Sequence, residues 1–454
     1  MIAPLSRTGT GRIAHGVHPE EHKELARQSP IEILPAPASI VLALLQHTGA
    51  PCEAVVKTRD AVEAGQLIGD SKAFISAPVH TPVAGVVQRE SVATLPNGRH
   101  VKTIPIQTAT GQPESEALRQ DQFGGDWTSG TLEDRGPEEI AGAVRAAGIV
   151  GQGGAAFPAH VKLTRNPAKP VDTLLLNGCE CEPYLTADDR LMVESPAQIL
   201  AGARLAARAA GANRVCIAIE DNKPEALKAL REAAGGIAEI LVLQSRYPMG
   251  GEKQTVRAAL GRTIPTGGLP LDVGVVMLNV ASAAAIARAV LRGKPLTHRV
   301  VSVTGEGIVR PRNVLAPIGA SYADLVAFCG GLKPEAVRVI AGGPMMGFAL
   351  ATLDVPITKG TSGIVALTAK QTRRAAETSC VRCGRCVDVC PLNLIPSRLA
   401  LATRQKNWDL ARRHHLAACM ECGCCAYVCP ASLPLVQLIR TGKVQMMKET
   451  AKKS

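Results

Sequence analysis

Two cysteine runs near the end of the chain decide how its last part must fold. They are Cys380-x2-Cys383-x2-Cys386-x3-Cys390-Pro391 and Cys419-x2-Cys422-x2-Cys425-x3-Cys429-Pro430. In this spacing three close thiolates hold one 4Fe–4S cluster, and the fourth, just before proline, turns to the other cluster. The sequence therefore predicts two clusters with crossed ligand sets: cluster one on Cys380, Cys383, Cys386 and Cys429, and cluster two on Cys419, Cys422, Cys425 and Cys390.

A zinc site and a disulfide framework are the alternative interpretations of these runs. Structural zinc usually takes its ligands from two Cys-x2–4-Cys pairs, not from quartets that end in Cys-Pro. Disulfide frameworks are typical of small secreted chains, whereas this chain has 454 residues. Cys424 could compete with its neighbour Cys425 as a ligand, but the regular spacing favours Cys425.

The composition is that of a folded globular protein, with 46% hydrophobic and 20% charged residues, and the length predicts about three domains. The net charge of +12 indicates an acidic partner, an anionic lipid surface or a phosphorylated ligand. Because the basic residues are not interleaved with aromatic ones, we expect no nucleic-acid binding. Residues 1–16 lack the apolar core of a signal peptide, and the apolar run 273–291 is interrupted by Asn279 and Arg288. We therefore expect no leader, no transmembrane segment and a reducing compartment for the 14 cysteines.

The pattern of the sequence divides the chain into four parts and predicts a multidomain α/β and β protein. Residues 1–128 alternate short apolar runs with Gly and Pro, which predicts a β-rich module. Residues 129–298 alternate helices with strands, which predicts a Rossmann-like parallel sheet flanked by helices. Residues 299–352 predict a small β-grasp unit, and residues 353–454 predict a helical domain around the cysteine runs.

The predicted elements of the second part are helices over 138–147, 196–210 and 224–234 and strands over 173–177, 215–219 and 240–243. The third part predicts a hairpin over 300–309, a helix over 322–329 and a strand over 337–340. Residues 111–134, rich in Gly, Ser and acidic side chains, predict a linker. In the first part, residues 63–87 resemble the barrel-sandwich hybrid of lipoyl and biotin carrier domains. Lys72 does not stand in the expected acceptor context, so we predict a scaffold of that shape and not a modified carrier.

A second site is indicated by a glycine-rich stretch, Gly151-Gln-Gly153-Gly154-Ala-Ala-Phe157-Pro158, which precedes Lys162. Such loops expose backbone N–H groups to a phosphate, which a lysine can neutralise. Turns account for most glycine runs, so this stretch alone is a weak signal. It is accompanied by three further loops: Asn177 to Pro183, Gly250 to Lys253, and Asn279-Val280.

Ligands of parallel sheets bind at the carboxyl ends of the strands, where these loops are expected. Asparagine offers donors and acceptors to a polar heterocycle, and carboxylates such as Glu180 and Glu182 can accept from ribose hydroxyls. Together the four loops predict a flavin and nucleotide site. The pair Cys179 and Cys181 lacks a second pair of metal ligands, and the early histidines His15, His18 and His22 are irregularly spaced, so structural roles are favoured for both groups.

These loops carry a family resemblance. The segments 151–158, 177–183, Asp189-Arg190, Gly251-Glu252 and Asn279-Val280 resemble the NADH-oxidising flavoprotein subunit of respiratory complex I. The segment 302–311 resembles the soluble-ligand-binding β-grasp (SLBB) domain that follows there. That flavoprotein, however, ends in a single-cluster domain. The opening Gly16-Val-His18-Pro19 with Lys23, the lipoyl-like module and two ferredoxin runs make the chain similar to the C subunit of the Rnf (Rsx) electron-transport complex, over nearly its whole length.

The resemblance implies residue roles. FMN would contact Gly151, Gly153, Gly154, Lys162, Asn177 and Asn279. NADH would be held by Phe157, Glu182 and Glu252. This sequence departs from the complex I pattern at two positions: Gln152 stands where arginine is common, and Cys179 stands where an aspartate contacts the flavin. These departures bear on individual contacts and not on the flavin itself.

The resemblance also implies a function. NADH gives up two electrons as a hydride and a cluster accepts one at a time, so a flavin is needed between them. The hydride step needs no side-chain acid or base, so we expect no catalytic side chain. The expected protein is the subunit through which electrons pass between NAD(H) and the other subunits of a membrane ion-translocating complex, with ferredoxin as a further partner. We expect it to be peripheral on the cytoplasmic face of the bacterial inner membrane. The alternatives are a soluble NADH dehydrogenase flavoprotein of another complex and a ferredoxin-like scaffold that binds no flavin.

Overall fold

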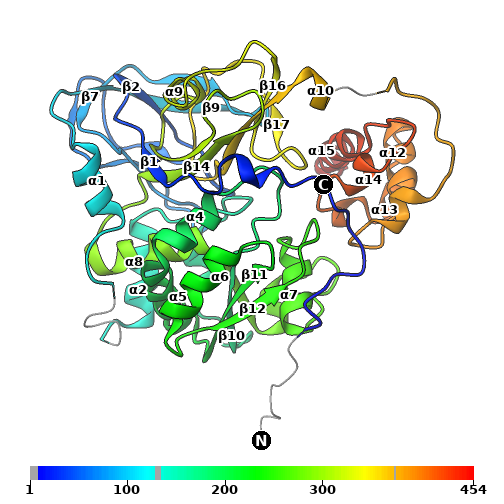
Figure 1. Cartoon of the computed structure of the whole chain (residues 1–454), viewed down its shortest axis with the longest axis horizontal. Coiled ribbons are helices and arrows are strands. Elements are labelled where there is room, and N and C mark those ends of the chain that lie inside the picture. Colours follow the sequence, from blue (N-terminus) through cyan, green and yellow to red (C-terminus); the bar gives the residue numbers. More distant parts are fainter. Residues whose placement is uncertain (1–8, 128–133, 373–374, 454) are drawn as a thin grey trace, which may run out of the picture.

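The computed structural model describes residues 9–127, 134–372 and 375–453. Figure 1 shows two β-rich parts side by side, an α/β part beneath them, and a small helical part at one side. The expected boundary between residues 128 and 129 lies outside the described residues. Among the described residues, every helix is too short or too polar to cross a membrane.

The α/β part contains a four-stranded parallel sheet in the order β12-β11-β10-β13. Its strands are β10 (Thr173–Asn177), β11 (Arg214–Glu220), β12 (Glu239–Leu243) and β13 (Val275–Asn279). The helices around it are α2 (Pro137–Ala146), α3 (Ala159–Leu163), α4 (Ala187–Glu194), α5 (Pro196–Ala210), α6 (Pro224–Ala234), α7 (Glu252–Leu260) and α8 (Val280–Arg292). The Rossmann-like prediction is confirmed. Helices α5 and α8 pack closely because Gly202 has no Cβ, which would lie 1.7 Å from the Ala283 carbonyl oxygen.

The N-terminal module is built from two antiparallel sheets, as a barrel-sandwich hybrid requires. One contains β2 (Ser39–Ala43), β9 (His100–Thr108), β7 (Gly85–Val87), β4 (Ala61–Val62) and β8 (Ser91–Thr94). The other contains β3 (Glu53–Ala54), β5 (Leu67–Asp70) and β6 (Val79–His80). The expected linker 111–134 is partly helical, since α1 spans Ser115–Gln122; residues 128–133 lie outside the described ranges.

The β-grasp part has a six-stranded sheet that reaches beyond the expected range 299–352. Its order is β1 (Ile31–Ile33), β15 (Arg312–Pro317), β14 (His298–Thr304), β18 (Gly363–Thr368), β16 (Ala336–Ala341) and β17 (Phe348–Ala349), with α9 (Tyr322–Phe328) beside it. Strand β1 comes from the first part and β18 from the expected helical part. The hairpin predicted over 300–309 was placed too short. Gly305, at φ 106°, starts a longer turn, and the returning strand begins only at Arg312.

The cluster domain consists of short helices wrapped around the cysteine runs. They are α11 (Arg385–Asp388), α12 (Pro396–Arg404), α13 (Trp408–Arg413), α14 (Cys424–Tyr427) and the longer α15 (Leu435–Lys453). Gly384 and Gly423 occupy equivalent places in the two runs, with φ values of 81° and 87°, and each starts one short helix. A left-handed residue is most easily supplied by glycine, so the duplicated sequence gives a duplicated local fold.

Candidate functional site: loops at the strand ends beside two cysteine runs

The polar ends of two neighbouring strands form the floor of the first site. Asn177 ends β10 and Asn279 ends β13, and the two residues are direct partners in the register of the parallel sheet. Asn279 caps α8 by accepting from the Ala281 N–H at 2.8 Å, and its Nδ2 donates to Asp188 Oδ2 at 2.6 Å. Asn177 Nδ2 donates to the Gly250 carbonyl at 2.8 Å. The structure therefore brings these two predicted residues together, as the strand ends suggested.

The glycine-rich loop lies against this floor. Its ends are pinned by a bridge between Val150 and Pro158, and the Gly151 N–H donates to the Phe157 carbonyl at 2.8 Å. A Cβ on Gly153 would lie 2.8 Å from Asn279 Nδ2, so only glycine lets the loop come this close. Gly153 and Gly154 are exposed and Phe157 is half-buried. An exposed glycine main chain over paired amides fits a flavin phosphate and its polar ring edge.

Gln152, which stands where arginine is common in complex I, is bound to Ser282 and Ala281 of α8 and to Arg299. Its N–H donates to Ser282 Oγ at 2.9 Å, and Arg299 of β14 donates to both its side-chain and its main-chain oxygen. Arg299 is buried, and burial lowers its pKa to about 10. The cation is thus supplied from the β-grasp part and fixes the glycine loop from behind. Sequence reasoning missed Arg299 because its partner is 147 residues away.

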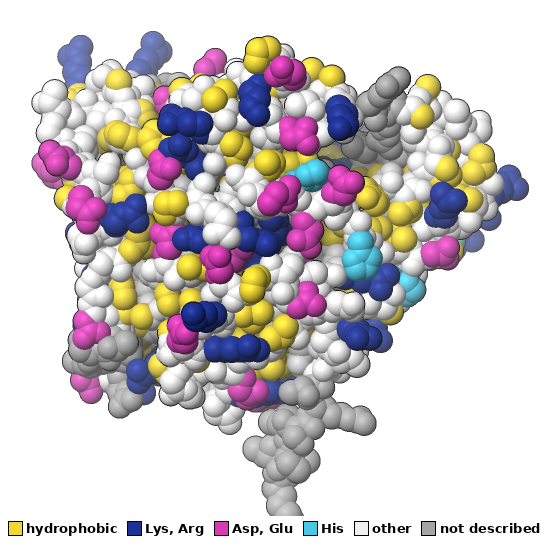
Figure 2. All heavy atoms as spheres, viewed as in Figure 1, with side chains coloured by type: hydrophobic (Ala, Val, Ile, Leu, Met, Phe, Trp, Pro, Cys, Tyr) yellow, Lys and Arg dark blue, Asp and Glu magenta, His cyan; other side chains and the backbone are white. Residues whose placement is uncertain are grey.

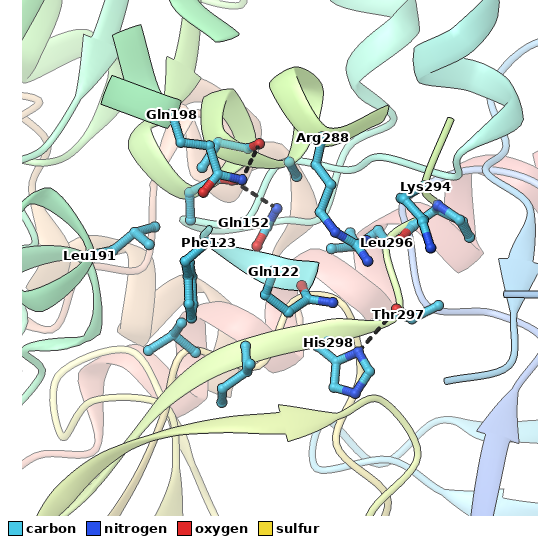
Figure 3. Close-up of a pocket in the computed structure, with 16 residues that line it drawn as sticks. Gln122, Phe123, Gln152, Leu191, Gln198, Arg288, Lys294, Leu296, Thr297 and His298 are labelled. Carbon is cyan, nitrogen blue, oxygen red and sulfur yellow. Dashed lines mark hydrogen bonds between the residues drawn. The ribbon is translucent and has the colours of Figure 1, made fainter. Parts of the chain in front are cut away.

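A cavity behind the loop is shown in Figure 3. Gln152 and Gln198 line it and donate to the carbonyl oxygens of Ala281 and Ala284 in α8 at 3.2 and 3.0 Å. Arg288, on the same wall, donates to Asp121 and to the Pro295 carbonyl. Since these polar groups are already paired within the protein, we assign this cavity to packing and not to ligand binding.

The charged residues of the site are arranged in pairs. Lys162 Nζ lies 3.1 Å from Glu252 Oε1 and donates to the Met277 carbonyl at 3.1 Å, and both side chains remain partly exposed. Glu180 accepts from the N–H groups of Asp188 and Asp189 at 2.8 and 3.1 Å and so caps α4. The Glu180 carboxylate therefore has a structural role, and its expected role toward a nucleotide stays a prediction.

Glu182 reaches across to the β-grasp part. Its oxygens accept from the N–H groups of Met345 at 3.1 Å and Met346 at 2.8 Å. A Cβ on Gly343 would lie 2.2 Å from this carboxylate, so the approach depends on glycine. Burial raises the pKa of both Glu180 and Glu182 to about 7.

The four cysteines expected to hold cluster two lie around one cavity. Cys390, Cys419, Cys422 and Cys425, the set predicted from the crossed spacing, line this cavity, and Cys424 lines it as well. The Leu394 N–H donates to Cys390 Sγ at 3.3 Å and the Glu421 N–H to Cys419 Sγ at 3.4 Å. Within the described ranges, no group of His, Cys, Asp or Glu is arranged to hold a single metal ion. A cube of iron and sulfide is larger than one ion, so four thiols around a space, with N–H groups aimed at sulfur, fit it.

Cluster one has a more open setting. Cys386 and Cys429 are half-buried and pack against the apolar group around Cys425, whereas Cys380 and Cys383 are exposed. Cys424, the alternative ligand, is buried, and its Sγ lies 4.0 Å from the Tyr247 carbonyl oxygen. This thiol thus lies both at the contact between domains and on the wall of the cavity, so the choice of Cys425 over Cys424 as a ligand stays a prediction. The early histidines are not gathered either: His15 contacts the Asp388 carbonyl and His22 stacks on Tyr184.

One loop joins the two sites. Gly250 accepts from Asn177, as described, and a Cβ on the next residue, Gly251, would lie 2.7 Å from Met420 Cε, between two ligands of cluster two. Tyr247, at the start of the same loop, is buried and donates its hydroxyl to the Cys422 carbonyl at 2.6 Å. Sequence reasoning did not single out Tyr247, since nothing in its local pattern reveals a contact 175 residues away.

Comparisons with known proteins agree with this geometry. Four family models match in order: the RnfC barrel sandwich hybrid domain over residues 11–111, the Nuo51 FMN-binding domain over 144–288, the SLBB domain over 300–349 and the 4Fe-4S dicluster domain over 379–433. The fold and the site are therefore those of an iron–sulfur flavoprotein that transfers electrons.

Curated relatives define the family more closely. The chain is 42% identical to the C subunit of the proton-translocating ferredoxin:NAD(+) oxidoreductase complex of Clostridium ljungdahlii, over 88% of this chain and 86% of that protein. It is 44% identical to the C subunit of the ion-translocating oxidoreductase complex of Rhodobacter capsulatus, over 97% and 84%. It is 39% identical to the C subunit of the Na(+)-translocating ferredoxin:NAD(+) oxidoreductase complex of Acetobacterium woodii, over 97% and 98%.

The chain belongs to the RnfC family, the C subunits of Rnf ion-translocating oxidoreductase complexes, so it is an oxidoreductase subunit with FMN and two 4Fe–4S clusters as cofactors. Among solved structures, an NAD+-reducing [NiFe]-hydrogenase in the H2-reduced state shares the fold at a TM-score of 0.50 and 21% identity. The match covers 70% of this chain and 63% of that chain.

Proposed function

We propose that this chain is the subunit through which electrons pass between NAD(H) and the membrane partners or ferredoxin of its complex. The observation that carries the proposal is that the loop 247–252 contacts both expected sites. Gly250 accepts from Asn177 of the expected flavin site, and Tyr247 and Gly251 lie against Cys422 and Met420 of the second cysteine run. When bound, FMN supplies the exchange between a hydride pair and single electrons. The names of the relatives, which include ferredoxin:NAD(+) oxidoreductase, support the same pair of substrates.

Different residues of the four loops would bind FMN and NADH. Gly151, Gly153, Gly154 and Lys162 would hold the phosphate side of FMN, and Asn177 and Asn279 would face its polar ring edge. Phe157, Glu182 and Glu252 would hold NADH, with Glu180 shaping the loop that carries Glu182. Lys162 and Glu252 neutralise each other at 3.1 Å. A bound phosphate would therefore draw the lysine away and free the carboxylate for a ribose hydroxyl.

The order of the clusters follows from the contacts. The expected site of cluster two lies against the loop 247–252 through Cys422 and Met420. Cys380 and Cys383, which are expected to hold cluster one, are exposed. Cluster two would therefore exchange electrons with the flavin, and cluster one with a partner subunit. On the side of the molecule seen in Figure 2, basic and acidic side chains are interspersed.

We assign the same four parts as domains, with β1 and β18 added to the β-grasp unit. The place proposed for the subunit is the cytoplasmic face of the bacterial inner membrane, attached through the other subunits. Supporting observations are the ion-translocating complexes of the relatives and a set of cluster thiols that needs a reducing compartment.

The test is an anaerobic titration of the reconstituted protein with NADH. The proposal expects one FMN and eight cluster irons per chain, and flavin and cluster absorbance that fall together as NADH is added. Flavin that stays oxidised with excess NADH would overturn the nucleotide assignment. Clusters without any FMN binding would leave only an electron-transfer scaffold.

A further inference from the structure

The N-terminal segment 9–25 places one buried lysine, Lys23, beneath the loop 180–185, which carries Glu180 and Glu182. Lys23 is 2% exposed and lies in a short 3-10 helix, Lys23–Leu25. Its ammonium donates to the main-chain carbonyl oxygens of Glu180 at 2.8 Å, Glu182 at 3.0 Å and Leu185 at 2.6 Å. An ammonium group has three donors, and all of them are used on one six-residue stretch.

The stretch that Lys23 holds has an unfavourable backbone. Glu180 has a φ of 43° and Tyr184 a φ of 71°, values that residues other than glycine rarely adopt. The same N-terminal segment adds two contacts: the Glu21 carbonyl accepts from the Tyr184 N–H at 2.7 Å, and the ring of His22 stacks on that of Tyr184. Such a conformation persists only when its surroundings hold it, and Lys23 is the charged part of that support.

We propose that Lys23 is a positioning residue for the nucleotide. Its ammonium fixes the main chain of residues 180–185, so that the carboxylate of Glu182 points toward the N–H groups of Met345 and Met346, and it places positive charge near the carboxylates of Glu180 and Glu182. This inference rests on the proposed nucleotide role of Glu182 and Glu180. No contact between Lys23 and a ligand is required, because Lys23 acts through the loop.

The charges that face these carboxylates come from several elements. Glu180 faces Lys23, Lys223, Arg299, Asp188 and Asp189, and Glu182 faces Lys23 and Arg440, with Cys181, Tyr247 and Cys422 as the other titratable neighbours. Burial raises the pKa of both carboxyls, and Lys23 opposes that rise. Loss of the ammonium would therefore move their protonation to higher pH.

The test compares Lys23→Met with Lys359→Met. Lys359 is the matched control, since it is also buried and donates only to carbonyl oxygens, those of Pro78 and Gly148, at a different domain contact. We expect both variants to lose stability, but only Lys23→Met to weaken NAD+ binding, by about tenfold or more, with FMN affinity changed less than about threefold. The acidic limb of NADH binding should move to higher pH in Lys23→Met alone.

Hydrogen exchange gives a readout that does not need catalysis. The amides of Tyr184, Asp188 and Asp189 should lose protection in Lys23→Met and keep it in Lys359→Met. Lys23→Arg covers the case in which the methionine variant does not fold: the charge remains, so the pH limb should stay in place while NAD+ binding weakens. Unchanged NAD+ affinity and unchanged exchange in the Lys23 variants would overturn the inference. Wild-type protein that fails to bind NAD+ would instead overturn the proposed function.

Discussion

The hydroxyl of Tyr247 donates to the main-chain carbonyl of Cys422 at 2.6 Å and so connects the loop 247–252 to an expected ligand of cluster two. Both residues are buried, and Val17 of the N-terminal segment and Cys424 pack in the same apolar group. The hydrogen bond holds the loop 247–252 against the second cysteine run. Three domains that fold from distant parts of the sequence are thereby held at one electron-transfer junction.

Tyr247→Phe should separate hydride transfer from the later electron step. The variant keeps the ring but leaves the Cys422 carbonyl without its donor, at a cost of about 1–3 kcal/mol. We expect NADH to reduce the flavin at the wild-type rate while reduction of the clusters slows severalfold. Stopped-flow absorbance and thermal unfolding measure the two effects. Equal slowing of both steps would show that the tyrosine serves the nucleotide site instead.

Ligand variants should reveal the order of the clusters. Cys425→Ser removes a ligand of cluster two and Cys383→Ser removes a ligand of cluster one. Under single turnover with NADH, we expect a reduced-cluster EPR signal in Cys383→Ser and none in Cys425→Ser, because in the proposed order cluster two would pass electrons from the flavin to cluster one. A signal from cluster one that grows at the wild-type rate in Cys425→Ser would contradict this order.

Gly153→Ala should weaken FMN binding. The added Cβ would lie 2.8 Å from Asn279 Nδ2, so the loop or the amide must shift. We expect FMN affinity to fall by about a hundredfold, measured by fluorescence quenching of added FMN. Gly142→Ala in α2 is the control, since nothing lies within 4 Å of its Cβ position. It should retain FMN and match or slightly exceed the wild-type stability.

Binding of NADH should weaken as the pH falls through about 7. The pKa of Glu182 is raised to about 7 by burial, so the acceptor for a ribose hydroxyl is protonated below that pH and ionised above it. We expect the KM for NADH to rise toward pH 6 with less change in kcat. Glu182→Gln should raise KM at pH 8 and flatten most of this dependence, leaving the part that Glu180 contributes. An unaltered pH profile in Glu182→Gln would remove Glu182 from the nucleotide site.

Local patterns in the sequence predicted much of the fold. The strand 173–177 and the helices 196–210 and 224–234 have the predicted bounds, since their apolar period and flanking Pro or Gly mark their limits. The cysteine spacing predicted four thiols that line one cavity, because the ferredoxin rule specifies the crossed ligand, but Cys424 lines the same cavity and the ligand set itself stays a prediction.

What the sequence did not predict depends on long-range contacts. Strand β1 joins β15 across about 280 positions, and Lys23 finds its carbonyl partners about 160 positions away. The period of a short strand says nothing about the sheet it joins, and a lone lysine is usually exposed. Arg299 and Tyr247 were missed for the same reason: each has an ordinary local setting and becomes functional only through its distant partner.

The most direct test of the central claim is rapid anaerobic mixing of the protein, loaded with FMN and both clusters, with NADH. Flavin absorbance and freeze-quench EPR would be followed on the same samples. The account predicts that flavin absorbance changes first and that reduced-cluster signals follow, with cluster two ahead of cluster one. Clusters that become reduced while the flavin stays oxidised, or a flavin that NADH never reduces, would contradict it.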